Sequence, residues 1–147
     1  MAAQNVPGDD TERDAAFVVI PADECRTLLA TRQLGRIGLA GGPFPLILPV
    51  NYVLDGDAVV IRTDSPKITA AADHTRVAFE VDDVDERTRS GWSVLVQGWG
   101  QDLTDAAGSA FEQLRRRSIG PWAPGEKAHW LAVEIRHISG RRIRPPG

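Results

Sequence analysis

The sequence predicts a mainly β fold with a few peripheral helices, built as an antiparallel barrel. Short apolar or alternating runs follow one another along the chain, and regular helical crossovers between them are missing. A doubly wound parallel sheet needs a helix between successive strands, so this order favours antiparallel pairing. The Asp-Gly turn at 55–56 joins two apolar runs, which is a strong hairpin signal.

Length and composition predict a single domain of the ordinary globular kind. The chain has 147 residues, of which 42% are hydrophobic and 25% charged. Residues 1–15 are polar and lack periodicity, so we predict a flexible tail there and one domain over residues 16–147. The net charge of -3 argues against nucleic acid as a partner, because such proteins usually carry a basic surface.

Neither a membrane segment nor a metal site is predicted. No stretch is long and apolar enough to span a membrane, and a signal-peptide pattern is absent, which predicts a cytoplasmic protein. The single Cys25 excludes an internal disulfide and a cysteine zinc cluster, and we expect it to be a small buried residue. His74, His129 and His137 are scattered without metal-ligand spacing.

The sequence of the first half of the domain predicts a helix, a strand and a hairpin. The helix covers 21–33, with Pro21 in its first turn and Gly35 after its end. A short strand follows at 36–40, and the hairpin spans 46–63. Pro49 lies inside the first hairpin strand and predicts an edge position or a bulge, because proline cannot donate to the ladder.

The sequence of the second half predicts three further strands and two helices. A short helix at 66–72 precedes an alternating strand at 75–82, which a charged loop at 82–90 connects to the next strand. That long strand contains Gly98 and Gly100, where we expect a bulge or a close backbone approach.

A helix is predicted from Thr104 to about Ser118, and a last strand covers 129–143. The run Arg115–Arg117 near the end of that helix complements the C-terminal dipole and is predicted to be solvated.

Hydroxyl groups and cations gather where the second hairpin strand gives way to a helix start. This segment reads Arg62-Thr63-Asp64-Ser65-Pro66-Lys67. Free N–H groups at a helix start suit an anion, above all a phosphate, so the segment is a candidate phosphate site. The same residues also fit a plain helix start, with Ser65 as the cap, Pro66 at the first position and Lys67 in water.

Other catalytic motifs are absent from the sequence. It contains no nucleophile elbow, Walker loop or dinucleotide-binding glycine fingerprint, and no nucleophile–base pair can be argued. If the protein is an enzyme, the chemistry therefore belongs to a bound cofactor, with the protein supplying orientation and electrostatics.

The order of several short motifs resembles the pyridoxamine 5'-phosphate oxidase-like family, whose members are flavin-nucleotide-binding split β-barrels. The likeness is to its short actinobacterial members, and it spans roughly residues 20–144. The residues that carry it are Gly35-Arg36-Ile37, Pro49-Val50-Asn51-Tyr52, Arg62-Thr63-x-Ser65-x-Lys67, Phe79-Glu80-Val81-Asp82, Gly91-Trp92-Ser93-Val94-Leu95-Val96-x-Gly98 and Gly140-Arg141-Arg142.

The resemblance implies a homodimer with flavin mononucleotide (FMN) in a groove at the subunit interface. The strand at 46–51 would run beside the isoalloxazine and offer main-chain groups to it. The implied cofactor-binding residues lie on this strand, on the hairpin end and on two later strands: Pro49, Val50, Asn51, Tyr52, Arg62, Thr63, Ser65, Lys67, Trp92, Ser93 and Arg141.

Roles within this set also follow from the resemblance. Thr63, Ser65 and Lys67 would hold the phosphate. Strand alternation places Arg62 and Thr63 on opposite faces, so Thr63 is the preferred contact. Trp92, Ser93 and Arg141 would approach the cofactor from the partner subunit, with the tryptophans of the later strands (Trp92, Trp99 and Trp130) in the interface.

Departures from the family pattern leave the activity open. The oxidases carry glutamine at the position of Ser93 and end in an Arg/His-rich substrate-binding segment, of which only SGRRI is present here. Pyridoxamine phosphate is therefore a doubtful substrate. The cofactor is also open, because some relatives of this family bind deazaflavin or haem in place of FMN. Two hypotheses remain: an oxidoreductase that passes hydride from FMN or deazaflavin to a small molecule, and a non-catalytic cofactor-binding protein.

Overall fold

The computed structural model describes residues 17–105 and 129–144 of the chain. The predicted tail at 1–15, most of the helix predicted from Thr104 and the Arg115–Arg117 run therefore lie outside the described residues. The described part forms one seven-stranded antiparallel sheet in the order β1-β7-β4-β3-β2-β5-β6. An additional pairing between β7 and β6 closes β2 to β7 into a six-stranded barrel, with β1 added to the outer end of β7.

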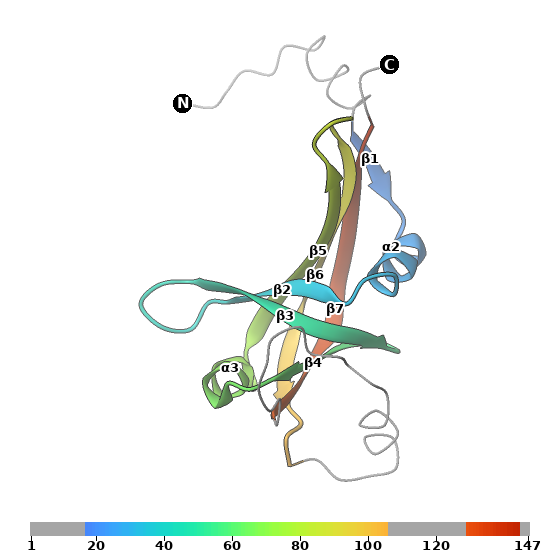
Figure 1. Ribbon diagram of the computed structural model, residues 1–147. Helices are drawn as coiled ribbons and strands as arrows, with labels where there is room; N and C mark the ends of the chain where they lie inside the picture. The colour runs from blue at the N-terminus through green and yellow to red at the C-terminus, as the bar shows by residue number, and fades with distance from the viewer. Residues whose placement is uncertain (1–16, 106–128, 145–147) are drawn as a thin grey trace, which may run out of the picture.

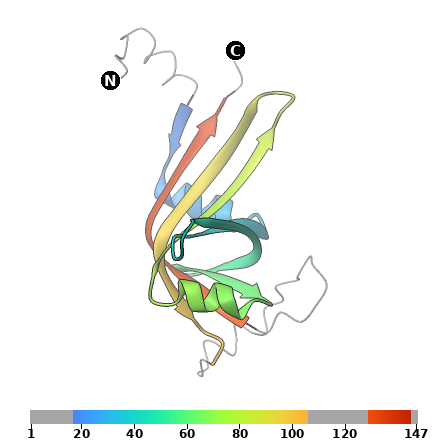
Figure 2. The same cartoon turned by 90° about the vertical axis from the view of Figure 1, so that its left-hand side faces the viewer.

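The strands differ in length, and this shapes the molecule. In Figures 1 and 2, the long strands β5, β6 and β7 extend together with β1 beyond the barrel as a curved ribbon, while β2, β3 and β4 cross them lower down. The strand bounds are β1 Phe17–Ile20, β2 Leu34–Leu39, β3 Leu46–Asp55, β4 Ala58–Thr63, β5 Arg76–Asp85, β6 Ser90–Asp102 and β7 His129–Ile143. The predicted mainly β barrel is confirmed.

Within the described ranges, two short helices flank the barrel. Helix α2 (Ala22–Leu29) packs on the inner side of the ribbon through Cys25 and Leu29, both of which are fully buried. The predicted burial of Cys25 is confirmed, and its thiol contacts the carbonyl of Ile20 at 3.5 Å. Helix α3 (Pro66–Ala72) has the predicted bounds. Neither helix of the described part is long and apolar enough to cross a membrane.

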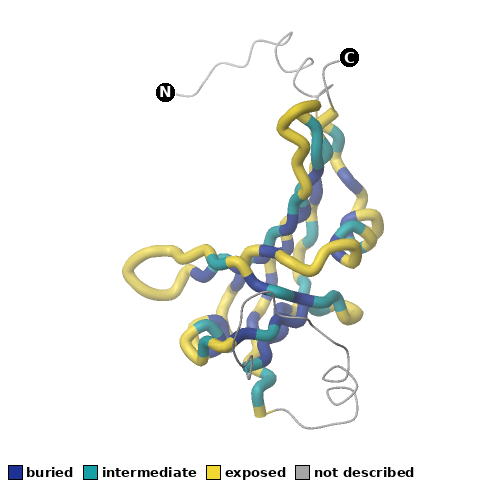
Figure 3. Tube along the Cα trace, viewed as in Figure 1, coloured by how far each residue is buried: buried dark blue, intermediate teal, exposed yellow. Residues whose placement is uncertain are grey.

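The core fills the barrel because alternate strand residues point inward. Ile37, Tyr52, Phe79 and Val94 come from four different strands and are each at most 1% exposed. The rings of Tyr52 and Phe79 meet edge to face, with their centroids 4.8 Å apart. Figure 3 shows the resulting alternation of buried and exposed residues along the strands.

The central hairpin forms as predicted and explains how a proline fits into it. β3 and β4 are joined at Gly56, which has a φ of 56° that glycine adopts easily. Pro49 pairs with Arg36 of β2, but the pairing of β3 with β4 begins only at Asn51. Pro49 therefore has a neighbouring strand on one side only. The edge position predicted for Pro49 is thus confirmed for this part of β3.

Three expectations about element bounds are corrected. The charged loop predicted at 82–90 is mostly strand, because β5 runs to Asp85 and β6 starts at Ser90. The carboxylate of Asp85 accepts hydrogen bonds from the N–H groups of Arg87 and Thr88 and so closes a tight turn. Helix α2 ends at Leu29, earlier than the predicted 33, and strand β1 was not predicted.

A bulge in β6 and β7 occurs where the glycines predicted it. The register between these strands shifts between Gln97 and Gly98. A Cβ atom on Gly98 would lie 1.7 Å from the carbonyl oxygen of Glu134, and one on Gly100 would lie 2.1 Å from that of Ala72. Both positions therefore require glycine for close backbone approach.

Candidate functional site

The junction between β4 and α3 brings Thr63, Ser65 and Lys67 together, as the sequence predicted. Thr63 ends β4 and is 5% exposed, and its hydroxyl accepts a hydrogen bond of 3.1 Å from the N–H of Ser65. Ser65 is the N-cap of α3, but its side chain makes no capping hydrogen bond. The Ser65 hydroxyl and the first N–H groups of the helix therefore do not bind each other. They lie beside the exposed Lys67.

Arg62 lies on the opposite face of β4 from Thr63, as strand alternation predicted. It pairs across the hairpin with Asn51, so these two polar residues share the outer face of the barrel. The guanidinium carbon of Arg62 lies 5.5 Å from the ring centroid of Trp130. This stacking directs Arg62 away from the side on which Thr63 lies.

One edge of β3 is open next to this junction. Residues 46–50 pair with β2 on one side, whereas β4 pairs only with residues 51–55. Main-chain groups on the second edge of residues 46–50 thus have no ladder partner among the described strands. Since β4 ends at Thr63, this open edge lies beside the hydroxyl-rich junction.

Tyr52 is placed differently from the other members of the predicted ring-binding segment. Its side chain is 1% exposed, and its hydroxyl donates a hydrogen bond of 2.5 Å to the carbonyl of Leu29. Its main-chain N–H donates to the carbonyl of Gln33 at 3.0 Å. Val50 also points inward and is 7% exposed, so it offers main-chain groups only. A side-chain contact from Tyr52 to a ligand on the outer face is therefore excluded.

Ser93 and Arg141 are brought together on the outer face of the ribbon. They are direct cross-strand partners on β6 and β7, and Asp82 of β5 flanks Ser93 on its other side. Trp92 points to the opposite, inner face, where it is 9% exposed and lies beneath Arg32, whose guanidinium carbon is 5.6 Å from the ring centroid. Trp92 and Ser93 thus lie on opposite faces of β6, because neighbouring strand residues face opposite ways, and the cofactor contacts implied for them stay predictions.

The tryptophans predicted at an interface are mostly inside the chain. Trp130 is 5% exposed and Trp92 is 9% exposed, whereas Trp99 is 39% exposed. Only Trp99 among these three has the exposure that a subunit contact needs.

A charged cluster that the sequence reasoning missed lies beside Pro49. Arg36 is the direct neighbour of Pro49 on β2, and its Nη1 lies 3.3 Å from a carboxylate oxygen of Glu80 and 3.3 Å from one of Asp82. Burial raises the pKa of Glu80 to about 7, with the hydrogen bond and charge of Asp82 adding to the rise and Arg36 opposing it. The sequence signal that could have indicated this cluster is the spacing of Glu80 and Asp82, which lie two residues apart and so share one face of the strand.

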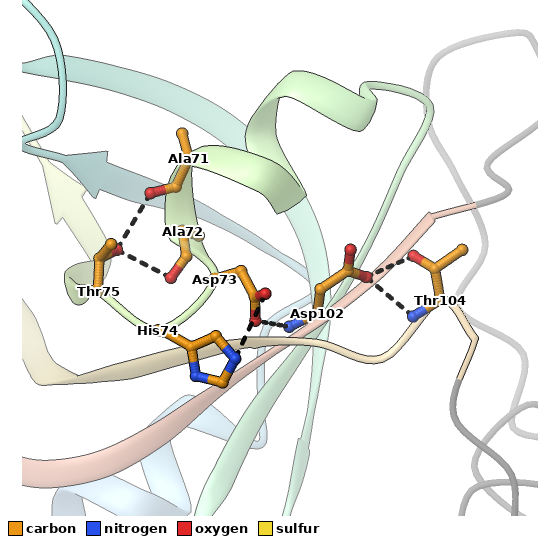
Figure 4. Close-up of polar contacts among 7 residues, drawn as sticks. All are labelled: Ala71, Ala72, Asp73, His74, Thr75, Asp102 and Thr104. Carbon is orange, nitrogen blue, oxygen red and sulfur yellow. Dashed lines mark hydrogen bonds and ion pairs between the residues drawn. The ribbon is translucent and has the colours of Figure 1, made fainter.

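A second polar cluster ties the end of α3 to the end of β6 (Figure 4). The carboxylate of Asp73 accepts a hydrogen bond of 2.8 Å from the N–H of Asp102, and its other oxygen lies 3.6 Å from Nε2 of His74. Thr104 donates to Asp102 through its hydroxyl and its N–H, which lowers the pKa of that carboxyl. In the part of the chain that the structure describes, no group of three or more metal-ligating residues could hold a metal ion.

A family model described as pyridoxamine 5'-phosphate oxidase matches residues 21–142. The chain belongs to this family. The match covers both helices and most of the seven strands, so the family resemblance inferred from the sequence is confirmed.

Relatives of this family member include proteins from two species of Mycobacterium. An uncharacterized protein of Mycobacterium tuberculosis is 33% identical over 134 residues, which cover 86% of this chain and 85% of the relative. The structure of an FAD-binding protein from Mycobacterium smegmatis has a TM-score of 0.71 and 32% identity, and the match covers 86% of this chain and 98% of that one. An FAD- and haem-binding protein from the same organism, with a TM-score of 0.62 and 19% identity, shares the fold.

The predicted split β-barrel fold is therefore confirmed. Of the predicted site residues, the barrel gathers two groups on one chain. Thr63, Ser65 and Lys67 lie near the open edge of β3, while Ser93 and Arg141 lie together on the ribbon.

Proposed function

We propose that this family member is an oxidoreductase that uses a flavin nucleotide, FMN or FAD, to transfer hydride to a small molecule. The observation that carries the proposal is the junction of hydroxyls and a lysine beside the open edge of β3. The family match and the FAD-binding relative at 32% identity support a flavin as the group bound there. FMN and FAD share the isoalloxazine ring and the first phosphate, which are the parts that this site would hold.

The phosphate end fits the residues present. Ser65 offers a hydroxyl that does not cap its own helix, and Lys67, two residues later, offers an exposed ammonium group. Thr63 is held in place by the N–H of Ser65, and its hydroxyl proton remains available to donate to an anion. Together these groups can supply charge-assisted hydrogen bonds to a phosphate, and they bind it more strongly than neutral pairs would.

The ring end fits the open edge of β3. An isoalloxazine carries carbonyl oxygens and a ring N–H along one side, and the unpaired main-chain groups of residues 46–50 can meet them. Pro49 and Asn51 point outward from this segment and would flank the ring. A bound flavin supplies the hydride chemistry, and the chain's residues would orient the ring and its phosphate.

We propose that the second half of the site comes from a second copy of the chain, forming a homodimer. Ser93 and Arg141 lie on the ribbon, away from the phosphate residues of the same chain. They are surrounded on that face by five exposed apolar residues: Phe17, Val19, Val84, Leu95 and Ile143. An exposed apolar patch of this kind is typical of a protein interface, and burying it would carry Ser93 and Arg141 to the partner's cofactor.

A non-catalytic flavin-binding protein is the second candidate function. It is favoured by the Mycobacterium smegmatis relative, which is named for FAD binding and not for a reaction. A deazaflavin remains an alternative cofactor, because its longer anionic tail needs a basic groove and the chain has fifteen arginines against two lysines. Haem is a less favoured alternative.

Absorption spectroscopy of the purified full chain tests the cofactor. We expect the two visible bands of a bound oxidised flavin, or their appearance as a stoichiometric shift when FMN or FAD is added. Extraction by heat and chromatography then separates FMN, FAD, deazaflavin and haem. A protein that binds none of the flavins would contradict the proposal.

Turnover separates the two candidate functions. The flavin-loaded protein is mixed with reduced nicotinamide or reduced deazaflavin and with a panel of small acceptors, and consumption of the reductant is followed. Repeated turnover supports the oxidoreductase. A single reduction of the bound flavin without turnover on any acceptor supports the non-catalytic candidate.

A further inference from the structure

A pocket opens where strand β2 separates from strand β5. The pairing of β2 with β5 ends at Arg36 and Glu80, whereas β2 stays paired with β3 as far as Leu34 and Asn51. Residues 31–35 therefore diverge from β5 and leave a pocket of about 410 Å³ between themselves and Asp82. This volume is enough for a molecule with a single ring.

The lining of this pocket suits a small ring compound that carries an oxygen atom. Leu34 and Pro49 provide apolar surface. Arg36 and Asp82 also line the pocket, and Nη1 of Arg36 lies 3.3 Å from a carboxylate oxygen of Asp82. Arg32 is a further lining residue, but its guanidinium is bound to a neighbouring aspartate of β5. Arg36 and Asp82 are therefore the charged groups that a ligand would meet.

Asp82 forms a carboxyl pair with Glu80, which lies two residues earlier on the same face of β5. Nη1 of Arg36 also lies 3.3 Å from a carboxylate oxygen of Glu80, so one cation faces two carboxylates. Two like charges at this spacing favour keeping one proton on the pair. Burial, with the hydrogen bond and charge of Asp82, raises the pKa of Glu80 to about 7 against the opposing charge of Arg36. The pair can therefore hold a proton up to about pH 7, and Asp82 can present it to the pocket.

The neighbouring strands add little charge around this carboxyl pair. On β6, Glu80 and Asp82 face Leu95 and Ser93, neither of which titrates near neutral pH. Arg141 is the partner of Ser93 on β7, one strand further away. Within the described residues, the proton equilibrium of the pair therefore depends chiefly on the arginine that β2 contributes.

We propose that this pocket binds the oxygen atom of a small ring compound between Arg36 and the carboxyl pair, and that Asp82 delivers a proton to that oxygen. The inference rests on the proposed function and names the proton donor for its hydride transfer. Pro49 lines the pocket and also belongs to the β3 segment proposed to flank the flavin ring, so the bound compound would lie beside that ring.

The proton transfer balances the hydride transfer of the proposed function. The hydride comes from the reduced flavin and adds to a carbon atom of the bound compound, whose oxygen gains the displaced electron pair. The O–H bond of the carboxyl pair then breaks as a new O–H bond forms on the compound. The pair is left as two carboxylates beside Arg36 and regains its proton from water.

Titration of the full, flavin-free chain with pentafluorophenolate tests the pocket without any turnover. This probe is a small ring oxyanion that stays ionised over the pH range used, and ¹⁹F NMR measures its binding. We expect saturable binding that weakens at least about tenfold between about pH 6.5 and about pH 8.5, because the pair loses the proton that it donates to the probe.

Two variants assign this pH dependence. Glu80→Gln should bind the probe equally at both pH values, because the side chain that titrates is gone. Glu86→Gln in the β5–β6 turn is the matched control and should keep the profile of the parent chain. Thermal unfolding of each variant confirms that it is folded. No saturable binding, a flat profile in the parent chain, or the parent profile in Glu80→Gln would overturn the proposal.

Turnover of the flavin-loaded chain tests the donor role of Asp82. Asp82→Asn should lower turnover about a hundredfold and leave flavin affinity unchanged, since general acid catalysis contributes at least this much. Unchanged turnover in Asp82→Asn would overturn the donor role. A parent chain that binds pentafluorophenolate with the expected pH profile, but shows no turnover, would contradict the proposed function and support the oxyanion pocket.

Discussion

At the scale of single residues, strand alternation decides which polar groups can reach a ligand. Thr63 and Arg62 are neighbours in sequence, yet the Thr63 hydroxyl meets the N–H of Ser65 at the start of α3, whereas Arg62 stacks on Trp130 on the opposite face. Tyr52 is a polar residue inside a predicted binding segment, but its hydroxyl is already bound to Leu29 in the core. Residue type alone therefore overstated the side chain of Tyr52, whereas Ser65 and Lys67 lie at the start of α3 and their contact with a phosphate stays a prediction.

Lys67→Ala should weaken the binding of FMN by about tenfold or more. A charge-assisted contact to phosphate contributes roughly 1.5–3 kcal/mol, and the exposed lysine lies at the lower end of that range. Riboflavin, which has no phosphate, should bind the variant and the parent chain equally. The check is a fluorescence titration with both ligands, and an equal loss for both would assign Lys67 to the fold instead.

Tyr52→Phe should lower stability and leave turnover nearly unchanged. The lost hydroxyl leaves the carbonyl of Leu29 with only the long hydrogen bond of 3.5 Å from the N–H of Arg32, which costs roughly 1–3 kcal/mol. Burial raises the pKa of Tyr52 above its ordinary value, so the group holds its proton and is a poor acid. Chemical denaturation and turnover are measured together, and a rate loss of a hundredfold with flavin still bound would reveal a catalytic role.

At the scale of elements, the β6–β7 bulge and the charged face of β5 carry most of the irregular features. The bulge places a glycine where two backbones meet and sends two consecutive basic residues to one side. On β5, two carboxylates two residues apart share one arginine from β2. Both features depend on pairing between segments that are distant in sequence.

Gly98→Ala should destabilise the fold by roughly 1–3 kcal/mol or more, because the new methyl group would collide with backbone and not with a flexible side chain. Gly41→Ala is the matched control, since a Cβ atom there meets nothing within 4 Å. Urea denaturation of both variants measures the difference. Equal stability of the two variants would show that the bulge relaxes easily.

Glu80→Gln should reduce the pH dependence of stability between about pH 4.5 and pH 7. The pKa of Glu80 is raised from 4.5 to about 7 in the folded chain, so in this range the folded state binds more protons than the unfolded state. Its contribution is fully present below about pH 4.5 and is lost as the pH rises through about 7. Melting temperatures at several pH values, with Glu86→Gln as control, should show a flatter profile only for Glu80→Gln.

At the scale of the whole molecule, the proposed dimer would be formed by the ribbon beyond the barrel. Its outer face exposes a row of apolar residues across four strands, formed by Val84, Ile143 and Phe17 with Gly91 between them. The opposite face is covered by α2. A surface of this kind in water is stabilised when a second surface covers it.

The chain should therefore have twice its single-chain mass in solution. The buried area should be that of an obligate dimer, on the order of 2,000 Å² or more. Light scattering at micromolar concentration measures the mass, and a value of 16.0 kDa would contradict the dimer. Val84→Lys adds a charge to the apolar row and should shift the protein toward single chains without unfolding it, because Val84 is 60% exposed.

The sequence by itself determined the order of strands β2 to β7 along the chain, the central hairpin and the glycine-dependent bulge. These features follow from local signals: alternation, an Asp-Gly turn, and glycines inside an apolar strand. Helix α3 was also readable, because Ser65 and Pro66 form a standard helix start. The candidate phosphate residues lie within this one local segment, which is why they could be named in advance.

Only the tertiary structure decided which strands are neighbours and therefore which side chains meet. Arg36, Glu80 and Asp82 come from two strands that are distant in sequence, and their contact depends on the pairing of β2 with β5. The same holds for the open edge of β3, which exists because β4 ends at Thr63. Pairing partners are set by burial across the whole barrel, and no local run of residues carries that information.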